Sequence, residues 1–291
     1  MKVFYDERML EHKQDYFHPE RKERIERSKE VLDENGIKTC KPKEFNEEIF
    51  RKVHDESYLN FLKNFRGYLT PDTLVRENTY EIAKISAFCS LSVGETLLKG
   101  ENAFALNRPP GHHACRDHGG GFCYLNNIAI TAYYLREKGM ERIFILDWDG
   151  HHGNGTQEIF YDVNWVYYLS IHQKGIYPFT GYENETGEGE GKGFNRNIPV
   201  PYGTGDEEYL KIFDRIILKE IERYKPEVIL ISAGQDSHKN DPLVGLKLST
   251  EAYGRFIKKL RDYPVGAILE GGYDIDSVAY SNLEIIKEMS I

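Results

Sequence analysis

The sequence predicts an α/β fold, a single domain of three layers in which helices cover both faces of a mainly parallel sheet. Two observations support this class. Short, continuously apolar runs alternate with segments whose apolar residues recur at helical spacing, over most of the 291 residues. Continuous apolar runs are typical of strands buried on both faces, and their alternation with helices is typical of a parallel sheet packed between two helical layers.

Five short apolar runs bounded by turn residues are the predicted strands. They are AFAL (103–106), IFIL (143–146), WVYYLSI (165–171), VILIS (228–232) and GAILE (266–270).

Two predicted helices have recognisable ends. We expect Thr79 to cap the first, which stops before Gly100. We expect Asp206 to cap the second, which stops before Pro226. The residues at helical spacing are Ile82, Ile85, Phe88 and Leu91 in the first, and Leu210, Phe213, Ile217 and Ile221 in the second.

The chain shows no repeat, no low-complexity linker and no break in composition, so we expect one domain over residues 1–291. The Gly- and Glu-rich stretch 180–193 (TGYENETGEGEGKG) is predicted to be one long surface loop.

The charge and hydropathy of the chain exclude some partners. The formal net charge is −9, from 38 basic and 47 acidic residues, which disfavours nucleic acid. No apolar run approaches the roughly 20 residues that span a bilayer, and MKVFYDERML lacks the apolar core of a signal peptide. We therefore expect a cytoplasmic protein with no membrane partner, of undetermined oligomeric state.

The chain has four cysteines, and none of them forms a C-x-x-C pair. A thiolate zinc site and a redox dithiol are therefore poorly supported, and buried, reduced thiols are the simpler interpretation. The four are Cys40, Cys89, Cys115 and Cys123.

Polar residues gather where four of the predicted strands end. The segments are RPPGHH (108–113), DWDGHH (147–152), AGQDSH (233–238) and GGYD (271–274). Ligands of open parallel sheets bind beyond the carboxyl ends of the strands, so these four segments should meet at one edge.

A cation would explain the aspartates in this group. If the chain stays extended, Asp147, Asp149 and His151 point the same way. Buried carboxylates are costly without a counter-charge, and an Asp-x-His pair can offer an oxygen and a nitrogen to a metal. Asp236 can supply a third ligand, which leaves the open position typical of a catalytic zinc site.

Structural roles compete with this interpretation. Each aspartate alone could be a helix N-cap or form an Asx turn. The convergence of acidic residues and paired histidines favours the metal site, whereas His152 alternates to the other face. Five further histidines are expected to be surface or hydrogen-bonded structural residues: His12, His18, His54, His172 and His238.

Taken together, these segments resemble the histone deacetylase family, which includes acetylpolyamine amidohydrolases and acetoin-utilisation proteins. The matching pieces are HPER (18–21), RPPGHHA (108–114), GFCYLNN (121–127), ILDWDGHHGNGTQEIF (145–160), AGQDSHKNDPL (233–243) and LEGGYD (269–274). They cover almost the whole chain and are most similar to the class II branch.

The resemblance implies a role for each matched residue. The zinc ligands would be Asp149, His151 and Asp236. The proton-transferring histidines would be His112 and His113, partnered by Asp147 and Asn154, and Tyr273 would donate to the oxyanion. The resemblance implies Zn²⁺, with Fe²⁺ as an alternative.

The resemblance also implies a substrate tunnel and a second cation site. The substrate-binding residues would be Gly121, Phe122, Tyr177 and Leu243. A structural K⁺ would be held by Asp147, Asp149, His151, Ser170 and Ile171.

This chain departs from the family's pattern at three positions. Gln235 stands where class II members usually carry Phe, and Asp274 stands where Asn is common. The segment YPFTG (177–181) stands where YPGTG is common. The first two departures affect the expected fine specificity more than the chemistry.

The function these residues predict is zinc-dependent hydrolysis of an N-acyl amine, with acetyl-lysine as the expected type of group. Metal-activated water, tandem histidines and a tyrosine donor would supply the chemistry. The alternatives are an acetylpolyamine or other small-molecule amidohydrolase, a two-metal ureohydrolase, a Cys–His hydrolase using Cys115 or Cys123, and a metal-binding protein without catalysis. Leu243 weakens the polyamine alternative, because polyamine-selective relatives tend to carry an acid there.

Overall fold

The core of the structure is one sheet whose eight strands all pair in parallel. The computed structural model describes residues 1–14 and 17–291, and within them the strand order is β2-β1-β5-β10-β9-β6-β7-β8. The strands are β1 (Lys2–Phe4), β2 (Thr39–Cys40), β5 (Ala103–Ala105), β6 (Ile143–Asp147), β7 (Val166–Gln173), β8 (Asn195–Val200), β9 (Val228–Ala233) and β10 (Val265–Leu269). A separate antiparallel hairpin is formed by β3 (Gly67–Thr70) and β4 (Thr73–Val75).

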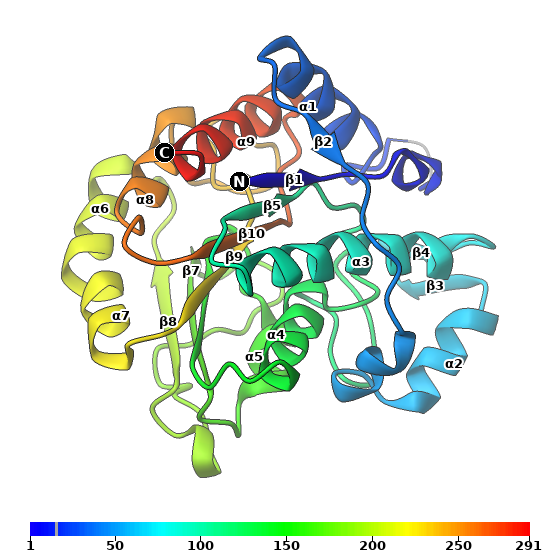
Figure 1. Ribbon diagram of the computed structural model, residues 1–291, viewed down its shortest axis with the longest axis horizontal. Helices are drawn as coiled ribbons and strands as arrows, with labels where there is room; N and C mark the ends of the chain where they lie inside the picture. The colour runs from blue at the N-terminus through cyan, green and yellow to red at the C-terminus, as the bar shows by residue number, and fades with distance from the viewer. Residues whose placement is uncertain (15–16) are drawn as a thin grey trace.

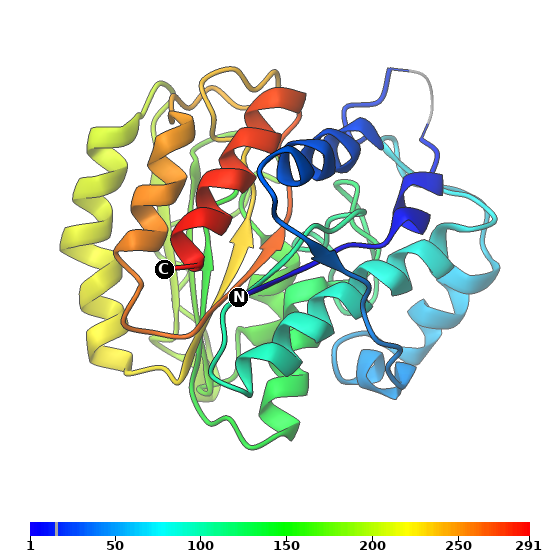
Figure 2. The same cartoon turned by 45° about the horizontal axis from the view of Figure 1, so that its top comes forward.

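Helices cover both faces of this sheet, as Figures 1 and 2 show from two directions. One layer contains α3 (Thr79–Leu97), α4 (Asn127–Glu137) and α5 (Asn154–Phe160). The other contains α1 (Glu23–Glu34), α8 (Thr250–Lys258) and α9 (Ile275–Met289), with α6 (Asp206–Ile212), a π-helical turn (Phe213–Ile217) and α7 (Leu218–Tyr224) packed beside α8. A further helix, α2 (Glu56–Asn64), lies near the hairpin, and short 3-10 turns span Glu7–Glu11, Glu47–Lys52 and Gly189–Gly191. The predicted three-layer α/β/α class is confirmed.

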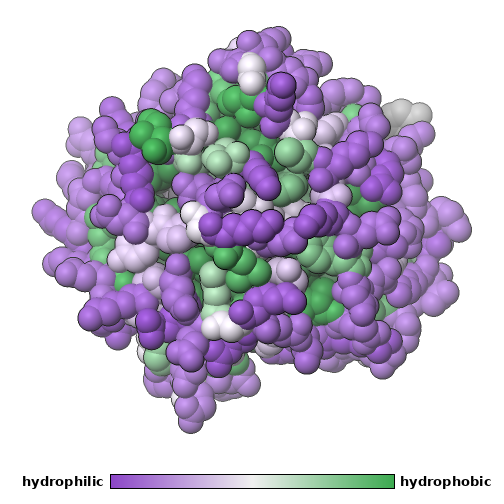
Figure 3. All heavy atoms as spheres, viewed as in Figure 1, coloured by the Kyte–Doolittle hydropathy of each residue, from purple (hydrophilic) through white to green (hydrophobic). Residues whose placement is uncertain are grey.

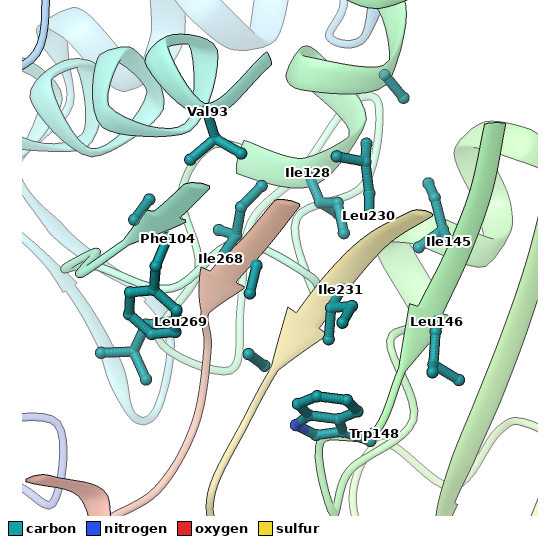
Figure 4. Close-up of a cluster of buried hydrophobic side chains, with 14 of the residues drawn as sticks. Val93, Phe104, Ile128, Ile145, Leu146, Trp148, Leu230, Ile231, Ile268 and Leu269 are labelled. Carbon is teal, nitrogen blue, oxygen red and sulfur yellow. The ribbon is translucent and has the colours of Figure 1, made fainter. Parts of the chain in front are cut away.

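Each of the five predicted strands is present, with ends within two residues of the prediction. The core forms because both faces of the central strands are apolar. Figure 4 shows Leu146 and Ile231 on one face of the sheet, and Ile145 and Leu230 on the opposite face beside Ile128 of α4. Alternate side chains of a strand point to opposite faces, so a continuously apolar strand packs against both helical layers.

The two predicted helix caps were wrong in detail. Asn78, not Thr79, precedes α3, and the hydroxyl of Thr79 accepts a hydrogen bond from the backbone N–H of Arg76 at 2.8 Å. Asp206 is the first residue of α6, and its carboxylate accepts from the backbone N–H (2.8 Å) and hydroxyl (2.7 Å) of Ser249. Asp206 therefore fixes the start of α8 instead of capping its own helix.

The stretch 180–193 is only partly the surface loop that its composition predicts. Gly187 and Gly191 are buried, and the 3-10 turn Gly189–Gly191 lies against the carbonyl of Tyr161, which accepts from the N–H of Glu188 at 2.9 Å. The glycines allow this close packing of backbone on backbone, because a Cβ at Gly191 would lie 2.3 Å from that carbonyl oxygen.

The outer surface matches the charged composition. The face seen in Figure 3 is covered mostly by hydrophilic residues, with apolar residues visible between them. No helix in the described part of the chain is long and apolar enough to cross a membrane.

Gly266 of β10 is expected to be essential for packing between the sheet and α3. A Cβ there would lie 2.6 Å from Val93 and 2.7 Å from Leu97. Because such overpacking usually costs about 1–3 kcal/mol, we expect Gly266→Ala to lower the free energy of unfolding by that amount in urea titrations. Gly254→Ala in α8 is the matched control, since the space there is adequate and alanine favours a helix. Equal stability of the two variants would contradict this packing.

Candidate active site

The four polar segments meet at the carboxyl edge of the sheet because their strands are consecutive. In the order β5-β10-β9-β6, each of these strands is followed directly by one of the segments. Residues up to about 160 apart in the sequence therefore lie side by side.

Three of these residues form a compact donor group. One ligand atom from each of Asp149, His151 and Asp236 lies within 4.8 Å of the others, and both aspartates are fully buried. The Nδ1 atom of His151 lies 2.7 Å from Oδ2 of Asp236 and 3.3 Å from Oδ1 of Asp149. Within the described residues this is the only such group of three, so the second carboxylate set of a two-metal ureohydrolase is missing there.

The chain reaches this arrangement by turning, not by staying extended as predicted. β6 ends at Asp147, whose Oδ1 accepts from the N–H of Asp149 at 3.2 Å. In the same way, Oδ1 of Asp149 accepts from the N–H of His151 at 2.9 Å. The Asx-type bonds that competed with the metal interpretation are therefore present together with the donor group.

The buried groups of this donor set strongly shift one another's pKa values. Burial and the neighbouring charge of Asp149 raise the pKa of Asp236 to about 8. Burial also opposes the ionisation of Asp149, but His112 and His151 hold its pKa well below the usual range. Burial would lower the pKa of His151, yet its hydrogen bonds to both aspartates raise it to about 10. Two carboxylates and an imidazole at these distances are the donor set that a divalent ion such as zinc accepts.

The tandem histidines have different partners. Nδ1 of His112 lies 3.2 Å from the Asp147 carboxylate, which also accepts from the Tyr168 hydroxyl at 3.0 Å. Nδ1 of His113 donates to the amide oxygen of Asn154 at 2.8 Å, so its Nε2 is free to accept a proton.

These partners separate the pKa values of the two rings. Burial would lower the pKa of His112, but the carboxylates of Asp149 and Asp147 outweigh it and raise the pKa to about 10. Burial and the neighbouring His112 and His151 lower the pKa of His113 well below its usual value. His113 is therefore the neutral ring and His112 the charged one near neutral pH.

The loop that carries Tyr273 is held at every residue. Gly271 donates to Asp149 at 2.8 Å, and the N–H of Tyr273 donates to Asp241 at 2.7 Å. The guanidinium of buried Arg24 donates to the carbonyls of Glu270 and Gly272. The second glycine, Gly272, has φ +118, a conformation open to glycine and rarely to other residues.

Tyr273 itself is suited to donate a hydrogen bond without carrying charge. Its ring is 8% exposed and lies at 5.1 Å from the guanidinium of Arg24. Burial raises the pKa of its phenol well above the usual value, so the hydroxyl keeps its proton.

A pocket of about 360 Å³ opens onto this group. Its lining includes five of the predicted site residues besides His113 and His151: Gly121, Phe122, Tyr177, Leu243 and Tyr273. It also includes four residues that sequence reasoning did not assign to the site: His18, Pro19, Asp72 and Ile176.

Aromatic rings and a glycine pack closely against one another in the wall of the pocket. Phe122 lies edge-on to Tyr273, with ring centroids 5.8 Å apart, and Tyr177 lies edge-on to His113 at 5.1 Å. Gly121 has φ +54, and a Cβ there would lie 2.5 Å from His113 and 2.9 Å from Tyr177. Glycine is therefore required both by conformation and by space. Its carbonyl accepts from the Cys123 thiol at 3.4 Å, which leaves a second lone pair for a ligand.

Of the residues that were missed, His18 and Pro19 belong to the HPER segment, so the resemblance could have placed them. His18 contacts the backbone carbonyl of Asp72 at 3.0 Å and lies edge-on to Phe122 at 4.7 Å. His18 is hydrogen-bonded as expected, and its ring also lines the pocket. No pattern in the sequence indicated that Asp72, on the turn between β3 and β4, would line the pocket.

The other expected structural histidines are buried and hydrogen-bonded. His152, the uncertain member of the pair, contacts Thr180 at 2.7 Å and Gln157 at 3.1 Å. The remaining four are His12, His54, His172 and His238, each with at least one hydrogen-bond partner.

The residues predicted to hold a monovalent cation are brought close to each other on neighbouring strands. Asp147 of β6 pairs in register with Ser170 of β7, and both are fully buried. The Ser170 hydroxyl contacts Nδ1 of His172 at 2.8 Å, and Ile171 follows on the same strand.

The three residues that depart from the family's pattern, Gln235, Asp274 and Phe179, all lie outside the pocket lining. Gln235 is buried beneath the Tyr273 loop, and neither polar atom of its side chain has a hydrogen-bond partner among the described residues. Asp274 caps α9 by accepting from the N–H of Ser277 at 3.0 Å. The substitution of Asp for Asn at position 274 therefore has a structural role.

The cysteine alternatives lose support. Burial raises the pKa of both the Cys115 and the Cys123 thiols, so neither is the activated thiolate that a Cys–His hydrolase needs. Cys89 is buried too, but Cys40 is exposed, contrary to the expectation for all four.

The fold and the site together place a candidate metal-binding group and paired histidines at the edge of a parallel sheet, and comparison with known proteins identifies the family. The model of the histone deacetylase domain matches residues 18–289. A "Probable deacetylase" of Archaeoglobus fulgidus is 41% identical over 99% of this chain and 86% of its own length. A "Histone deacetylase-like amidohydrolase" of Pseudomonas aeruginosa is 35% identical over 94% of this chain and 77% of its own.

Solved structures give the same result. The HDA15 HD domain has a TM-score of 0.95 and 33% identity, covering 100% of this chain and 91% of the other. An acetylpolyamine aminohydrolase from Burkholderia pseudomallei has a TM-score of 0.93 and 30% identity, covering 100% and 98%. The chain belongs to the histone deacetylase family and is an enzyme of the deacetylase class.

Asp149→Ala and Asp236→Ala are expected to lose the bound divalent ion and the activity, because each removes one of three donors. Elemental analysis of the purified variants checks this, with Asp276→Ala on the exposed start of α9 as the control. Full zinc occupancy in either active-site variant would refute the ligand assignment.

Asn154→Asp is expected to change the pH dependence of the reaction. An anion beside Nδ1 should raise the pKa of His113 by about one unit or more. A base works in its neutral form, so the acidic limb of the kcat/KM profile should move to higher pH. His113→Ala shows whether that limb depends on His113. An unmoved limb in Asn154→Asp, with metal and activity intact, would show that His113 is not the base.

Proposed function

We propose that this chain hydrolyses the amide bond of an acylated amine, with an acetylated lysine side chain as the substrate type, and that a divalent zinc ion is bound by Asp149, His151 and Asp236. The observation that carries the proposal is the meeting of this donor group, a neutral His113 and the Tyr273 hydroxyl at the end of one aromatic-lined pocket. Fe²⁺ remains an alternative to zinc, because it accepts the same donors.

When bound, the metal ion would polarise the scissile carbonyl and lower the pKa of water. His113 takes the proton from the attacking water at Nε2, while Asn154 fixes its tautomer through Nδ1. The Tyr273 hydroxyl donates to the developing oxyanion, and charged His112 stabilises it electrostatically. The proton held by His113 then passes to the leaving nitrogen as the C–N bond breaks, which yields a carboxylate and a free amine.

The pocket fits an acylated stem better than a bulky group. Phe122 and Tyr177 provide apolar contact along the stem, and the carbonyl of Gly121 can accept from the scissile N–H. Leu243 forms part of the rim and is 44% exposed. An acetylated polyamine is the second candidate, because the carboxylate-bearing Asp72 also lines the pocket.

A structural K⁺ is part of the proposal, at Asp147, Asp149, His151, Ser170 and Ile171. Burial raises the pKa of Asp147, so a nearby cation would stabilise its charged form. We further propose that residues 1–291 form one catalytic domain, while the cytoplasmic location stays a prediction.

The function is tested by assaying the zinc-loaded and chelator-treated protein on acyl-lysine peptides of increasing acyl length, acetylpolyamines and small esters. Fastest turnover of acetyl-lysine peptide, lost on chelation and restored by zinc, supports the proposal. Activity on acetylpolyamine alone would favour the second candidate.

Tyr273→Phe removes only the hydroxyl and keeps the ring between Phe122 and Arg24. If the hydroxyl acts mainly in the transition state, kcat should fall by about 10²-fold or more while zinc content stays unchanged. An unaltered kcat would place Tyr273 in packing alone.

A further inference from the structure

The backbone of Phe179 has a conformation that its side chain does not favour. Its φ is +63, in the left-handed region that glycine adopts readily and aromatic residues adopt rarely. The same feature occurs at Phe122, with φ +70, and that residue lines the pocket. Such conformations persist where the surroundings impose them and gather at ligand-binding sites.

The surroundings of Phe179 impose this left-handed conformation, because polar side chains of other segments fix the next two residues, Thr180 and Gly181. The Thr180 hydroxyl contacts His152 at 2.7 Å. Gly181 donates to Glu185 at 3.1 Å, and its carbonyl lies 3.1 Å from Nε2 of His172.

The side chain of Phe179 contributes little to the fold. It is 67% exposed, and within the described residues no aromatic ring or cation stacks on it. An exposed apolar side chain alone needs no explanation, but one that also holds a strained backbone without packing on the protein points to a binding role.

The position of Phe179 close to the pocket indicates that the molecule it contacts is the substrate. Its N–H donates to the carbonyl of Ile176 at 2.8 Å, and both Ile176 and Tyr177 line the pocket. Tyr177 and Leu243, also in the lining, are 39% and 44% exposed. Phe179 therefore lies on a turn whose neighbouring residues line the pocket, and we call the exposed residues Tyr177, Phe179 and Leu243 the rim.

We propose, on the basis of the proposed function, that Phe179 is a specificity-determining residue that contacts the polypeptide on either side of an acylated lysine. An acylated stem fills the pocket, so only a substrate with residues beyond the stem reaches this rim. The one carboxylate in the pocket lining, that of Asp72, already accepts from the hydroxyls of Thr70 and Thr73 at 2.6 and 3.0 Å. A rim of this kind suits apolar flanking residues better than the ammonium groups of a polyamine.

The experiment compares Phe179→Gly and Phe179→Ala with the wild type on three substrates: an acetyl-lysine peptide with apolar flanking residues, free Nε-acetyl-lysine and acetylspermidine. Both variants should lower kcat/KM for the peptide by about tenfold, through KM, and leave free Nε-acetyl-lysine unchanged. Glycine relieves the backbone conformation, so Phe179→Gly should melt no lower than the wild type, whereas Phe179→Ala keeps the strain. If Phe179→Gly melts no lower than the wild type, its weaker binding of the peptide cannot be caused by a loss of folded protein. Phe61→Ala on α2, which removes a 46% exposed phenylalanine outside the pocket lining, is the control.

Three outcomes would overturn this inference. An unchanged KM for the peptide would show that the ring makes no contact. An equal loss on the peptide and on free Nε-acetyl-lysine would place the effect inside the pocket, and a loss confined to acetylspermidine would assign the rim to polyamines. If the zinc-loaded wild type cleaves neither the peptide nor free Nε-acetyl-lysine, the proposed function fails, and this inference fails with it.

Discussion

The structure depends on the placement of two carboxylates, Asp149 and Asp236, side by side in the dry centre of the sheet edge. Neither has access to water, so each must be balanced by donors from the protein or by a cation. Gly150 donates to Asp236 at 2.6 Å, and Gly271 donates to Asp149 at 2.8 Å. Each bond crosses from one strand-end loop to another, so the need to balance these charges joins the loops after β6, β9 and β10.

The same buried carboxylates determine how the pKa values of His112 and His113 differ. His112 lies close to the carboxylates and is held charged, whereas His113 is one residue further and faces an amide oxygen. Two identical side chains therefore differ in protonation because their neighbours differ in charge. The proposed acid–base and oxyanion-stabilising roles require opposite protonation states, and the two rings differ in this way.

Much of this could be predicted from the sequence because strongly apolar strands and their polar ends are local signals. From the run IFIL a core strand could be predicted, and from the segment DWDGHH two of the three candidate metal ligands. The reason given for their geometry was wrong, because the chain turns after Asp147 through side-chain bonds that apolar periodicity does not reveal. Asp72 was missed because its approach to the pocket depends on how its own hairpin packs against His18 and Phe122, which are far from it in the sequence. The conformation of Phe179 likewise depends on His152 and Glu185, which are distant polar partners.

The strand order has a consequence for how the chain folds while it is being synthesised. β10, the last strand of the sheet in the chain, lies between β5 and β9, and it pairs with both. Until residues 265–269 have left the ribosome, β5 and β9 each have an unpaired edge in the middle of the future sheet, where another chain could add itself. The Tyr273 loop also follows this strand, so a partly synthesised chain would already contain Asp149, His151 and Asp236 while it still lacked Tyr273. Maturation would therefore end with the insertion of a central strand, which both closes the sheet and completes the site.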